Sequence, residues 1–404
     1  MRRQLAAAFA ALLVVGGCTA GEPILANPGA VVPSIAAPTD RPVAIADPLP
    51  VVLPRDDGPH DRLTEWWYYT GHLRGTVADV ADGLPPEFGF EYVFFRAERG
   101  SFPTTWASHL AITDERGRRF FYSQRLEVGD AVDRSARDAD GVPQRFDLAL
   151  TGLDPADEAT FDRPAWRMTG ADGRDELSAS LSSEEAEAAG SPGGLGLALT
   201  AGATKPPALH DRDGWIDFGP AGGSYYYSRT AMDALGTLTL DGEDIAVTGE
   251  AWFDHQWGDF ISVGGGGWDW FAVNLDDGTD LTLSLVRDAD GSYPLIYGTV
   301  VDRDGTTRHL DRDAFTVEVT DRWTSPATGA DYPAGWTIDI PSEGDLVIEL
   351  RPTVAAQELD TRATTGVVYW EGSQVVEGTR AGTPISGEAY VELTGYAPSG
   401  VAGP

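Results

Sequence analysis

The chain has 404 residues, of which 42% are hydrophobic and 10% aromatic, a composition typical of a globular protein. This length exceeds that of one ordinary domain and predicts two. The 63 acidic and 29 basic residues give a net charge of −34, which argues against nucleic acid or an anionic membrane surface as a partner.

The N-terminus has the features of an export signal. Arg2 and Arg3 precede an apolar run from Leu5 to Val15, which is too short to cross a bilayer comfortably. Small residues then lead to Cys18, the one cysteine of the chain, in an arrangement similar to a bacterial lipobox. We therefore predict a lipoprotein signal peptide over residues 1–18, with the lipid on Cys18. The alternative is an ordinary signal peptide that is removed together with Cys18.

Both interpretations predict an exported protein without a disulfide bond, whose stability depends on its hydrophobic cores. The lipobox further predicts a membrane-anchored lipoprotein, on the outer side of the cytoplasmic membrane or in the periplasm. Residues 19–54 are predicted to be an extended tether between the anchor and the globular part, because frequent proline blocks both helix and sheet. The prolines of this segment are Pro23, Pro28, Pro33, Pro38, Pro42, Pro48, Pro50 and Pro54.

From Arg55 onward the pattern is mostly that of β-strands. Apolar residues alternate at every second position from Phe88 to Phe94 and again from Leu281 to Leu285. Residues 182–190 are rich in Glu and Ala and could form a short helix, but their Ser and Gly neighbours favour a surface loop. Asp-Gly pairs separate the strand-like runs, as expected of hairpins: Asp82-Gly83, Asp172-Gly173, Asp241-Gly242, Asp277-Gly278, Asp290-Gly291 and Asp304-Gly305. The sequence predicts an all-β protein, either sandwich or barrel.

Short motifs recur along the chain. The pattern Glu-x-Trp-aromatic occurs at residues 65–68 and again at 250–253, and the tetrad at 249–252 recurs with one change at 387–390. We therefore predict two related β-modules, over residues 55–245 and 246–397, with Glu65 and Glu250 at comparable positions.

The segment from Glu250 to Asn274 concentrates rare residue types. Four tryptophans and one histidine lie there among acidic residues: Trp252, Trp257, Trp268, Trp270 and His255, with Glu250, Asp254, Asp259 and Asp269. Aromatic faces beside carboxyl groups make a site that is apolar yet able to exchange protons. Such a site suits a hydrophobic, polyene-like ligand and could protonate one.

Six stretches of the chain, one of them inside this segment, form a recognisable set: residues 65–73, 106–114, 205–214, 223–230, 252–260 and 369–396. Together they resemble the carotenoid 1,2-hydratase and AttH family, whose members are also called lipocalin-like secreted hydrolases. The resemblance implies two packed lipocalin-like antiparallel β-barrels and an apolar ligand. Reactions in the family include hydration of terminal carotenoid double bonds, hydration of a prenyl side chain and control of intramolecular cycloadditions. The sequence contains neither Gly-x-Ser-x-Gly nor His-Glu-x-x-His, so it gives no support for a hydrolase.

The resemblance also implies site residues. A His-x-Trp pair of the hydratases corresponds to His255 and Trp257, and the downstream acid to Asp269. An acid among indoles has a raised pKa because desolvation disfavours its charged form, and tryptophan faces attract a carbocation. We expect His255 and Asp269 to be catalytic and to converge with Trp257 on one apolar cavity. The expected ligand-binding residues are Trp257, Trp252, Trp268, Trp270, Trp67 and Tyr69.

Other interpretations of these residues stay open. The tryptophans could fill a core, and Asp254 or Asp259 could cap a turn. His109, His210 and His309 are isolated, and no spacing predicts a metal site or a cofactor. The expected partners are a hydrophobic small molecule (isoprenoid, carotenoid or lipid) and a membrane through the lipid anchor. The protein is then either a hydratase (a hydro-lyase) acting by acid catalysis or a non-catalytic carrier lipoprotein.

Overall fold

A computed structural model describes residues 47–76, 83–152, 163–260 and 266–397. The predicted signal peptide with Cys18, and the predicted tether as far as residue 46, lie outside these described residues. The last part of the predicted tether, residues 47–54, lies against the globular part, where the Leu49 amide donates to the Tyr225 hydroxyl at 2.7 Å. None of the helices in the described part of the chain has the length and apolar character of a membrane span.

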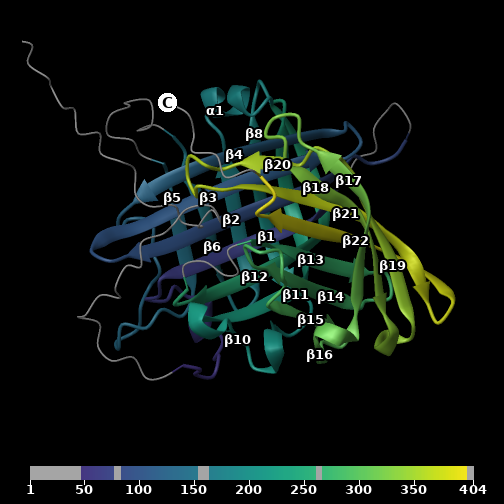
Figure 1. Ribbon diagram of the computed structural model, residues 1–404. Coiled ribbons are helices and arrows are strands. Elements are labelled where there is room, and N and C mark those ends of the chain that lie inside the picture. Colours follow the sequence, from purple (N-terminus) through teal and green to yellow (C-terminus); the bar gives the residue numbers. More distant parts are fainter. Residues whose placement is uncertain (1–46, 77–82, 153–162, 261–265, 398–404) are drawn as a thin grey trace, which may run out of the picture.

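Two antiparallel β-sheets make up the described residues, and they lie against each other (Figure 1). The first sheet has twelve described strands, with the order β4-β3-β2-β1-β12-β11-β8-β7-β6-β5, and β9 and β10 also pair with β11. The second has ten, in the order β16-β15-β14-β13-β22-β21-β19-β18-β17, and β20 also pairs with β21. The predicted all-β class is confirmed.

The strands of the first sheet are β1 (Thr64–Gly75), β2 (Glu87–Arg99), β3 (Phe102–Asp114), β4 (Arg119–Val128), β5 (Phe146–Leu150), β6 (Trp166–Ala171), β7 (Arg174–Ser180), β8 (Leu195–Ala203), β9 (Ala208–Leu209), β10 (Trp215–Asp217), β11 (Gly223–Leu240) and β12 (Glu243–Gly258). Its end strands β4 and β5 contact each other, so the sheet is strongly bent. Backbone hydrogen bonds also join β5 to the segment that follows β4, from the Arg134 amide to the Asp147 carbonyl and from the Ala149 amide to the Val132 carbonyl.

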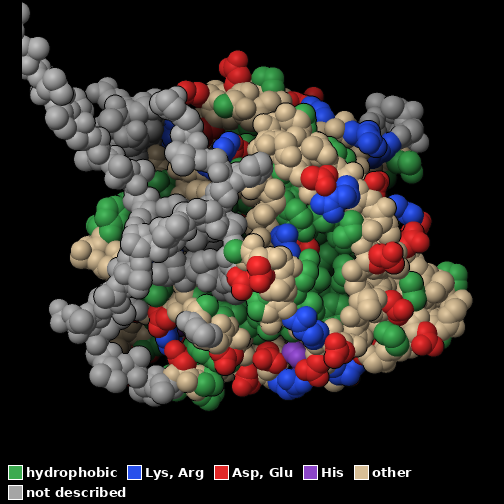
Figure 2. Space-filling model, viewed as in Figure 1, with side chains coloured by type: hydrophobic (Ala, Val, Ile, Leu, Met, Phe, Trp, Pro, Cys, Tyr) green, Lys and Arg blue, Asp and Glu red, His purple; other side chains and the backbone are tan. Residues whose placement is uncertain are grey.

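The strands of the second sheet are β13 (Gly267–Leu275), β14 (Asp280–Arg287), β15 (Leu295–Val301), β16 (Thr307–Leu310), β17 (Thr316–Thr324), β18 (Asp331–Ile340), β19 (Leu346–Pro352), β20 (Glu358–Asp360), β21 (Val368–Arg380) and β22 (Thr383–Thr394). The described helices are short: η1 (Arg55–Asp57), α1 (Ser183–Ala188), η3 (His210–Arg212), η4 (Gly219–Ala221), η5 (Arg312–Ala314) and η6 (Pro341–Glu343). In Figure 2, hydrophobic side chains line a hollow over the second sheet, and charged side chains of both signs surround it.

The two sheets share a topology in which the first long strand pairs with the last. β1 pairs with β12 in the first sheet, and β13 pairs with β22 in the second. The recurring tetrads at 249–252 and 387–390 therefore lie on equivalent strands. Glu65 and Glu250, in contrast, lie in the same sheet, opposite Trp257 and His72 respectively. The expected module boundary at residues 245 and 246 falls inside β12, which pairs with β1 and β11 of the first sheet.

Turn chemistry explains most of the connections. Five of the Asp-Gly pairs lie between consecutive paired strands, and Gly83 lies in the connection from β1 to β2. In two of these hairpins, at Asp172-Gly173 and Asp241-Gly242, both residues have positive φ, as a type I′ turn requires. Residues 183–188, expected to be a loop, form α1 instead. The reason is a capping box, in which the Ser182 side chain accepts from the Glu185 amide and the Glu185 side chain accepts from the Ser182 amide.

Each sheet has its own buried apolar cluster, and a third cluster lies at the seam where β1, β2 and β12 face β13, β21 and β22. On β1, Trp67 and Tyr69 join the first cluster, whereas Trp66 and Tyr68 join the seam. Alternate residues of a strand point to opposite faces, so the two faces of β1 pack against different apolar clusters. This arrangement buries both faces of β1. The candidate residues accordingly lie in two places, the interior of the first sheet and the seam.

Candidate functional site

Side chains from β1 and β12 meet inside the first sheet. The strand register places Trp67 opposite His255, Glu65 opposite Trp257, and Tyr69 opposite Phe253. Residues at every second position point to the same face. The six side chains therefore converge on one interior, which includes four of the predicted site residues, His255, Trp257, Trp67 and Tyr69.

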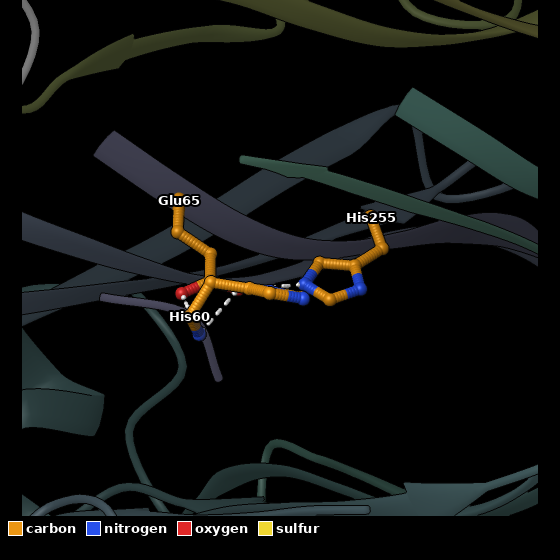
Figure 3. Close-up of side chains that lie close together, drawn as sticks. All are labelled: His60, Glu65 and His255. Carbon is orange, nitrogen blue, oxygen red and sulfur yellow. Dashed lines mark hydrogen bonds and ion pairs between the residues drawn. The ribbon is translucent and has the colours of Figure 1, made fainter. Parts of the chain in front are cut away.

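His60, Glu65 and His255 form a compact polar group in this interior (Figure 3). Glu65 Oε1 lies 2.7 Å from His60 Nδ1 and 3.0 Å from His255 Nε2. The backbone amide of His60 donates to Glu65 Oε2 at 2.9 Å. The side chains of Glu65 and His255 are fully buried, whereas that of His60 is 20% exposed. Both carboxylate oxygens of Glu65 thus have hydrogen-bond partners, and His60 is the residue of the three that reaches solvent.

The three groups shift one another's pKa. Burial opposes ionisation of Glu65, but the attraction of His60 and hydrogen bonds from His255 and His60 outweigh it and lower the pKa of Glu65 to about 2. Burial likewise lowers the pKa of His60, yet Glu65 and Asp56 reverse the effect and raise it overall. For His255 burial prevails over Glu65, and its pKa is lowered. The group therefore favours a charged His60, an ionised Glu65 and a neutral His255.

Aromatic rings pack against both imidazoles. The ring of Trp257 stacks on His60, with 4.1 Å between centroids, and Trp67 stacks on His255 at 4.8 Å. Trp106 lies beyond Trp67, 6.3 Å away. Two buried nitrogens of this interior have no hydrogen-bond partner, His255 Nδ1 and Trp106 Nε1. Because buried polar atoms almost always have partners, these two mark unmet hydrogen-bonding capacity beside aromatic faces.

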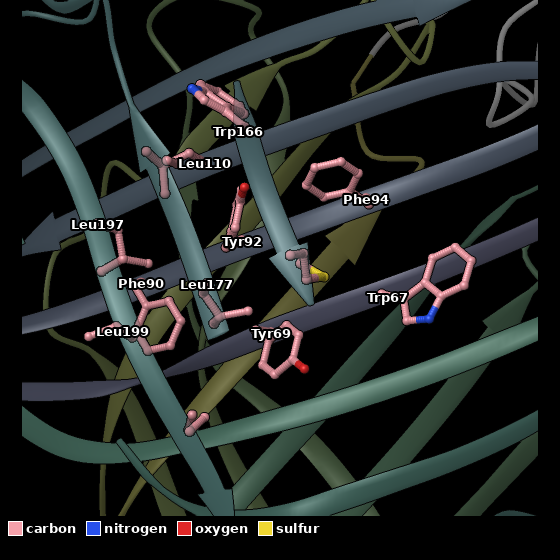
Figure 4. Packing of buried hydrophobic residues seen from close by; sticks show 14 of the residues in the cluster. Trp67, Tyr69, Phe90, Tyr92, Phe94, Leu110, Trp166, Leu177, Leu197 and Leu199 are labelled. Atoms are coloured by element: carbon pink, nitrogen blue, oxygen red, sulfur yellow. The ribbon is translucent and has the colours of Figure 1, made fainter. Parts of the chain in front are cut away.

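A second carboxyl group, Asp175 on β7, faces the same interior. It is 2% exposed, and its Oδ2 accepts a hydrogen bond of 2.8 Å from the hydroxyl of Tyr69, which lies with Trp67 in the apolar cluster of Figure 4. Asp175 Oδ1 has no partner. A Cβ atom at Gly170 would lie 1.9 Å from this oxygen and 2.6 Å from the ring of Phe146, so the oxygen borders that ring. Phe146 in turn lies 6.3 Å from Trp67, which links Asp175 to the histidine group through aromatic rings.

Burial also sets the acidity of Asp175. Desolvation raises its pKa to about 7, although the charge of Arg229 and the Tyr69 hydroxyl act in the opposite direction. Arg229 itself is paired with the buried Asp57 at 2.7 Å. Asp57 also accepts from the Tyr227 hydroxyl at 2.5 Å, and its carbonyl accepts from Trp67 Nε1 at 3.1 Å. Asp57 thus connects Arg229 and Tyr227, through its side chain, to Trp67, through its backbone carbonyl.

Trp252, Trp268 and Trp270, which are expected to bind the ligand, lie at the seam. The Trp252 indole donates to Asp254 Oδ1 at 2.6 Å, and the Trp270 indole donates to the Tyr226 hydroxyl at 3.0 Å. Tyr226 in turn donates to Asp254 at 2.5 Å, so Asp254 is a hydrogen-bond acceptor inside the seam rather than a turn cap. Trp252 and His255 are three positions apart on one strand and consequently face opposite sides.

Asp269 has a different setting from the one expected. It lies on β13, where its two oxygens accept from the Tyr396 hydroxyl at 3.0 Å and Oδ1 lies 3.2 Å from Arg287. Burial raises its pKa to about 6. The neighbouring Trp268 and Trp270 point to the other face of the strand, so they do not enclose the carboxyl group. Among the contacts of the described residues, none joins Asp269 to His255; the structure brings His255 and Trp257 together but not Asp269 with them.

The seam holds acids that sequence reasoning missed. Glu371 accepts from the Tyr68 hydroxyl at 2.7 Å, and Glu91 accepts from the Tyr369 hydroxyl at 2.8 Å. The second oxygen of each is buried without a partner. Burial raises the pKa of Glu91 to about 8 and that of Glu371 well above its ordinary value. A sequence signal existed for Glu91, since this glutamate interrupts a run of aromatic and apolar residues at 88–95.

His60 and Asp175 were also missed as site residues. His60 lies outside any strand, and Asp175 follows a hairpin turn among polar residues. Neither therefore had a local pattern that could have singled it out.

The fold and the buried polar group define a two-sheet, all-β protein with ionisable side chains inside an aromatic interior. The sequence model of the AttH-like family matches residues 44–396, and the chain belongs to that family. Among curated proteins none matches the chain.

Solved structures resemble the chain over most of its length. An AttH candidate from Nitrosomonas europaea is 29% identical, with a TM-score of 0.69 over 88% of this chain and 99% of the other. Kievitone hydratase from Nectria haematococca is 15% identical, with a TM-score of 0.60 over 85% and 93%. CghA is 13% identical, with a TM-score of 0.56 over 94% and 98%. At 15% and 13% identity, the likeness to kievitone hydratase and CghA shows a shared fold alone.

Proposed function

We propose that the protein binds an apolar, isoprenoid-like molecule inside the first sheet and adds water to one of its carbon–carbon double bonds. The observation that carries the proposal is the placement of two proton-exchanging groups in one aromatic interior. Asp175 is connected to Trp67 through the ring of Phe146, and His255 stacks on Trp67. Hydration of an alkene requires an acid, a surrounding that tolerates a carbocation and a group that accepts the proton of the attacking water.

Asp175 is the proposed acid, in place of Asp269. A pKa of about 7 keeps much of the carboxyl group protonated near neutral pH, and its Oδ1 is free of other partners. The proton of Asp175 forms the new C–H bond and leaves a carbocation on the adjacent carbon. The faces of Trp67 and Trp257 would stabilise this cation through their π-electrons.

The histidine group is the proposed acceptor. The oxygen of a water molecule forms the C–O bond with the cation, and the proton it loses passes to the group formed by His60, Glu65 and His255. Since His60 is partly exposed, the group can release this proton to solvent. Asp175 regains a proton from water, so the net change is the addition of one water molecule to the double bond.

The proposal also covers the architecture of the protein and its attachment to a membrane. We infer that each sheet serves as a lipocalin-like barrel, that Cys18 carries a lipid and that residues 19–46 tether the protein to a membrane after export. The support is the sequence of the N-terminus and the bent first sheet. The net charge of −34 supports small apolar molecules rather than nucleic acid as partners.

A carrier without catalytic activity is the alternative. The same aromatic interior would hold an apolar molecule without any proton transfer, and Asp175 would then be only the partner of Tyr69. The name of kievitone hydratase says that this relative is a hydratase; for the present chain, at 15% identity, hydration is proposed from its own residues.

Ligand binding and turnover can be separated experimentally. Lipids that co-purify with the full chain are identified by mass spectrometry, and binding of an acyclic prenyl compound is followed by quenching of tryptophan fluorescence. We expect binding by the wild type and by Asp175→Asn, with the hydrated product formed by the wild type alone. Asp147→Asn, on β5 of the same sheet, is the control and should retain turnover. Binding without turnover in the wild type supports the carrier, and absence of binding contradicts both proposals.

A further inference from the structure

We propose that His60 Nδ1, Glu65 Oε1 and His255 Nε2 form a binding site for one zinc ion. The ligand atoms of the three residues all lie within 4.8 Å of one another. Two imidazoles and one carboxylate are the donor set of a class of catalytic zinc sites, in which the protein supplies three ligands and water the fourth. Hard ions such as Ca²⁺ instead require six to eight oxygen ligands, which this group does not offer.

Two of the three distances between the ligand atoms are close to those of a tetrahedral zinc site. Bonds of about 2.0 Å in a tetrahedral arrangement place two ligand atoms about 3.3 Å apart. Glu65 Oε1 lies 2.7 Å from His60 Nδ1 and 3.0 Å from His255 Nε2. To admit the ion, His60 Nδ1 would move away from the oxygen by about 0.6 Å and His255 Nε2 by about 0.3 Å. The two nitrogens, which lie within 4.8 Å of each other, would also approach this spacing.

Groups around the three ligands hold them in place. His60 Nε2, the nitrogen that faces away from Glu65, lies 3.6 Å from Asp56 Oδ1. A carboxylate behind a histidine ligand orients the ring and increases its basicity toward a metal. The second oxygen of Glu65 is fixed by the His60 amide at 2.9 Å, and the two imidazole rings are stacked on Trp257 and Trp67. The site is preorganised, which is what a metal site requires of its surroundings.

Access and chemistry are also consistent with a catalytic ion. The 20% exposure of the His60 side chain provides a route from solvent, while Glu65 and His255 are fully buried. Water bound to zinc loses a proton near neutral pH. This role rests on the proposed function and changes one step of it. The ion would provide the water that adds to the carbocation, and that water would already have lost a proton to solvent, so the three ligands would not accept it. Binding of the ion does not depend on that function.

Zinc binding by the full chain tests the site directly. The protein is stripped with a chelator and titrated with zinc chloride by calorimetry in excess Ca²⁺, which occupies exposed carboxylates. We expect one tightly bound zinc ion per chain, confirmed by elemental analysis. Glu65→Gln and His60→Gln should each weaken binding at least tenfold, since loss of a partner behind a ligand alone costs about 10- to 100-fold. Glu115→Gln is the matched control, because Glu115 is a partly buried partner of His72, 3.7 Å away, in another part of the fold.

Folding of the variants is checked by near-ultraviolet circular dichroism and thermal unfolding without zinc. His60→Gln is the gentler variant, because its side chain is the only partly exposed one of the three. Equal zinc binding by the wild type and the folded variants, or no binding by the wild type, would overturn the site. Apolar-ligand binding by chelator-treated protein is measured in parallel. Retained ligand binding without zinc uptake rejects the zinc site alone, whereas zinc uptake without ligand binding rejects the proposed function alone.

Discussion

The hydroxyl of Tyr69 donates to Asp175 Oδ2 at 2.8 Å, which joins β1 to β7 across the interior of the first sheet. The bond leaves Asp175 Oδ1 as the free oxygen of a buried carboxyl group whose pKa is raised to about 7. It also ties the proposed acid to the strand that carries Glu65 and Trp67. The acidity of Asp175 and the geometry of the histidine group therefore depend on the same strand.

Tyr69→Phe tests this relationship. The Tyr69 hydroxyl lowers the pKa of Asp175, so its loss should raise that pKa further above about 7. Activity requires the protonated acid and falls as pH rises through its pKa; the alkaline limb of the pH–rate profile should therefore move to higher pH. The lost hydrogen bond should also destabilise the fold by roughly 1–2 kcal/mol, measured by urea unfolding. An unchanged alkaline limb in a folded variant would remove Asp175 from the acid role.

Arg229→Met tests the ion pair behind Trp67. The change leaves Asp57 charged and without its cation in a fully buried position, which should cost about 3–5 kcal/mol of unfolding free energy. The double variant Asp57→Asn with Arg229→Met should lose less than the sum of the two single changes, because neither charge is then left alone. Additive losses in denaturant titrations would show that the pair is not coupled.

Glu91→Gln tests the seam. The pKa of Glu91 is raised from 4.5 to about 8 by burial, with Tyr369 acting against the shift and the charge of Glu392 adding to it. Between these values the folded chain binds more protons than the unfolded chain, so stability should decrease as pH rises from about 4.5 to about 8. The variant should show a shallower decrease. Glu87→Gln, at the half-exposed start of the same strand, should keep the wild-type slope; equal slopes in all three proteins would contradict the prediction.

Cys18→Ala tests the anchor. If Cys18 carries a lipid, the variant should leave the membrane fraction, because the proline-rich residues 19–54 contain no segment that would hold a bilayer. Fractionation followed by immunoblotting measures the change. A variant that stays in the membrane fraction would show that the lipobox interpretation is incorrect.

The sequence was sufficient for the class of fold but not for the site. The alternation at 88–94 and the Asp-Gly pairs are local signals, and they predicted strands and hairpins correctly. The same alternation rule places Asp269 on the opposite face of its strand from Trp268 and Trp270. The echo of Glu65 in Glu250 was misleading, since a short motif does not specify the strand with which it will pair. His255 and Glu65 are 190 positions apart, and only the register of β1 and β12 brings them into contact.

Hydration in water enriched in oxygen-18 tests the central claim most directly. The full-length protein is incubated with an acyclic prenyl or carotenoid substrate, and the products are analysed by mass spectrometry. The account predicts a product heavier than the substrate by one molecule of labelled water, formed by the wild type and absent with Asp175→Asn, although both proteins bind the substrate. Binding by the wild type with no labelled product, or equal labelling by wild type and Asp175→Asn, would contradict it.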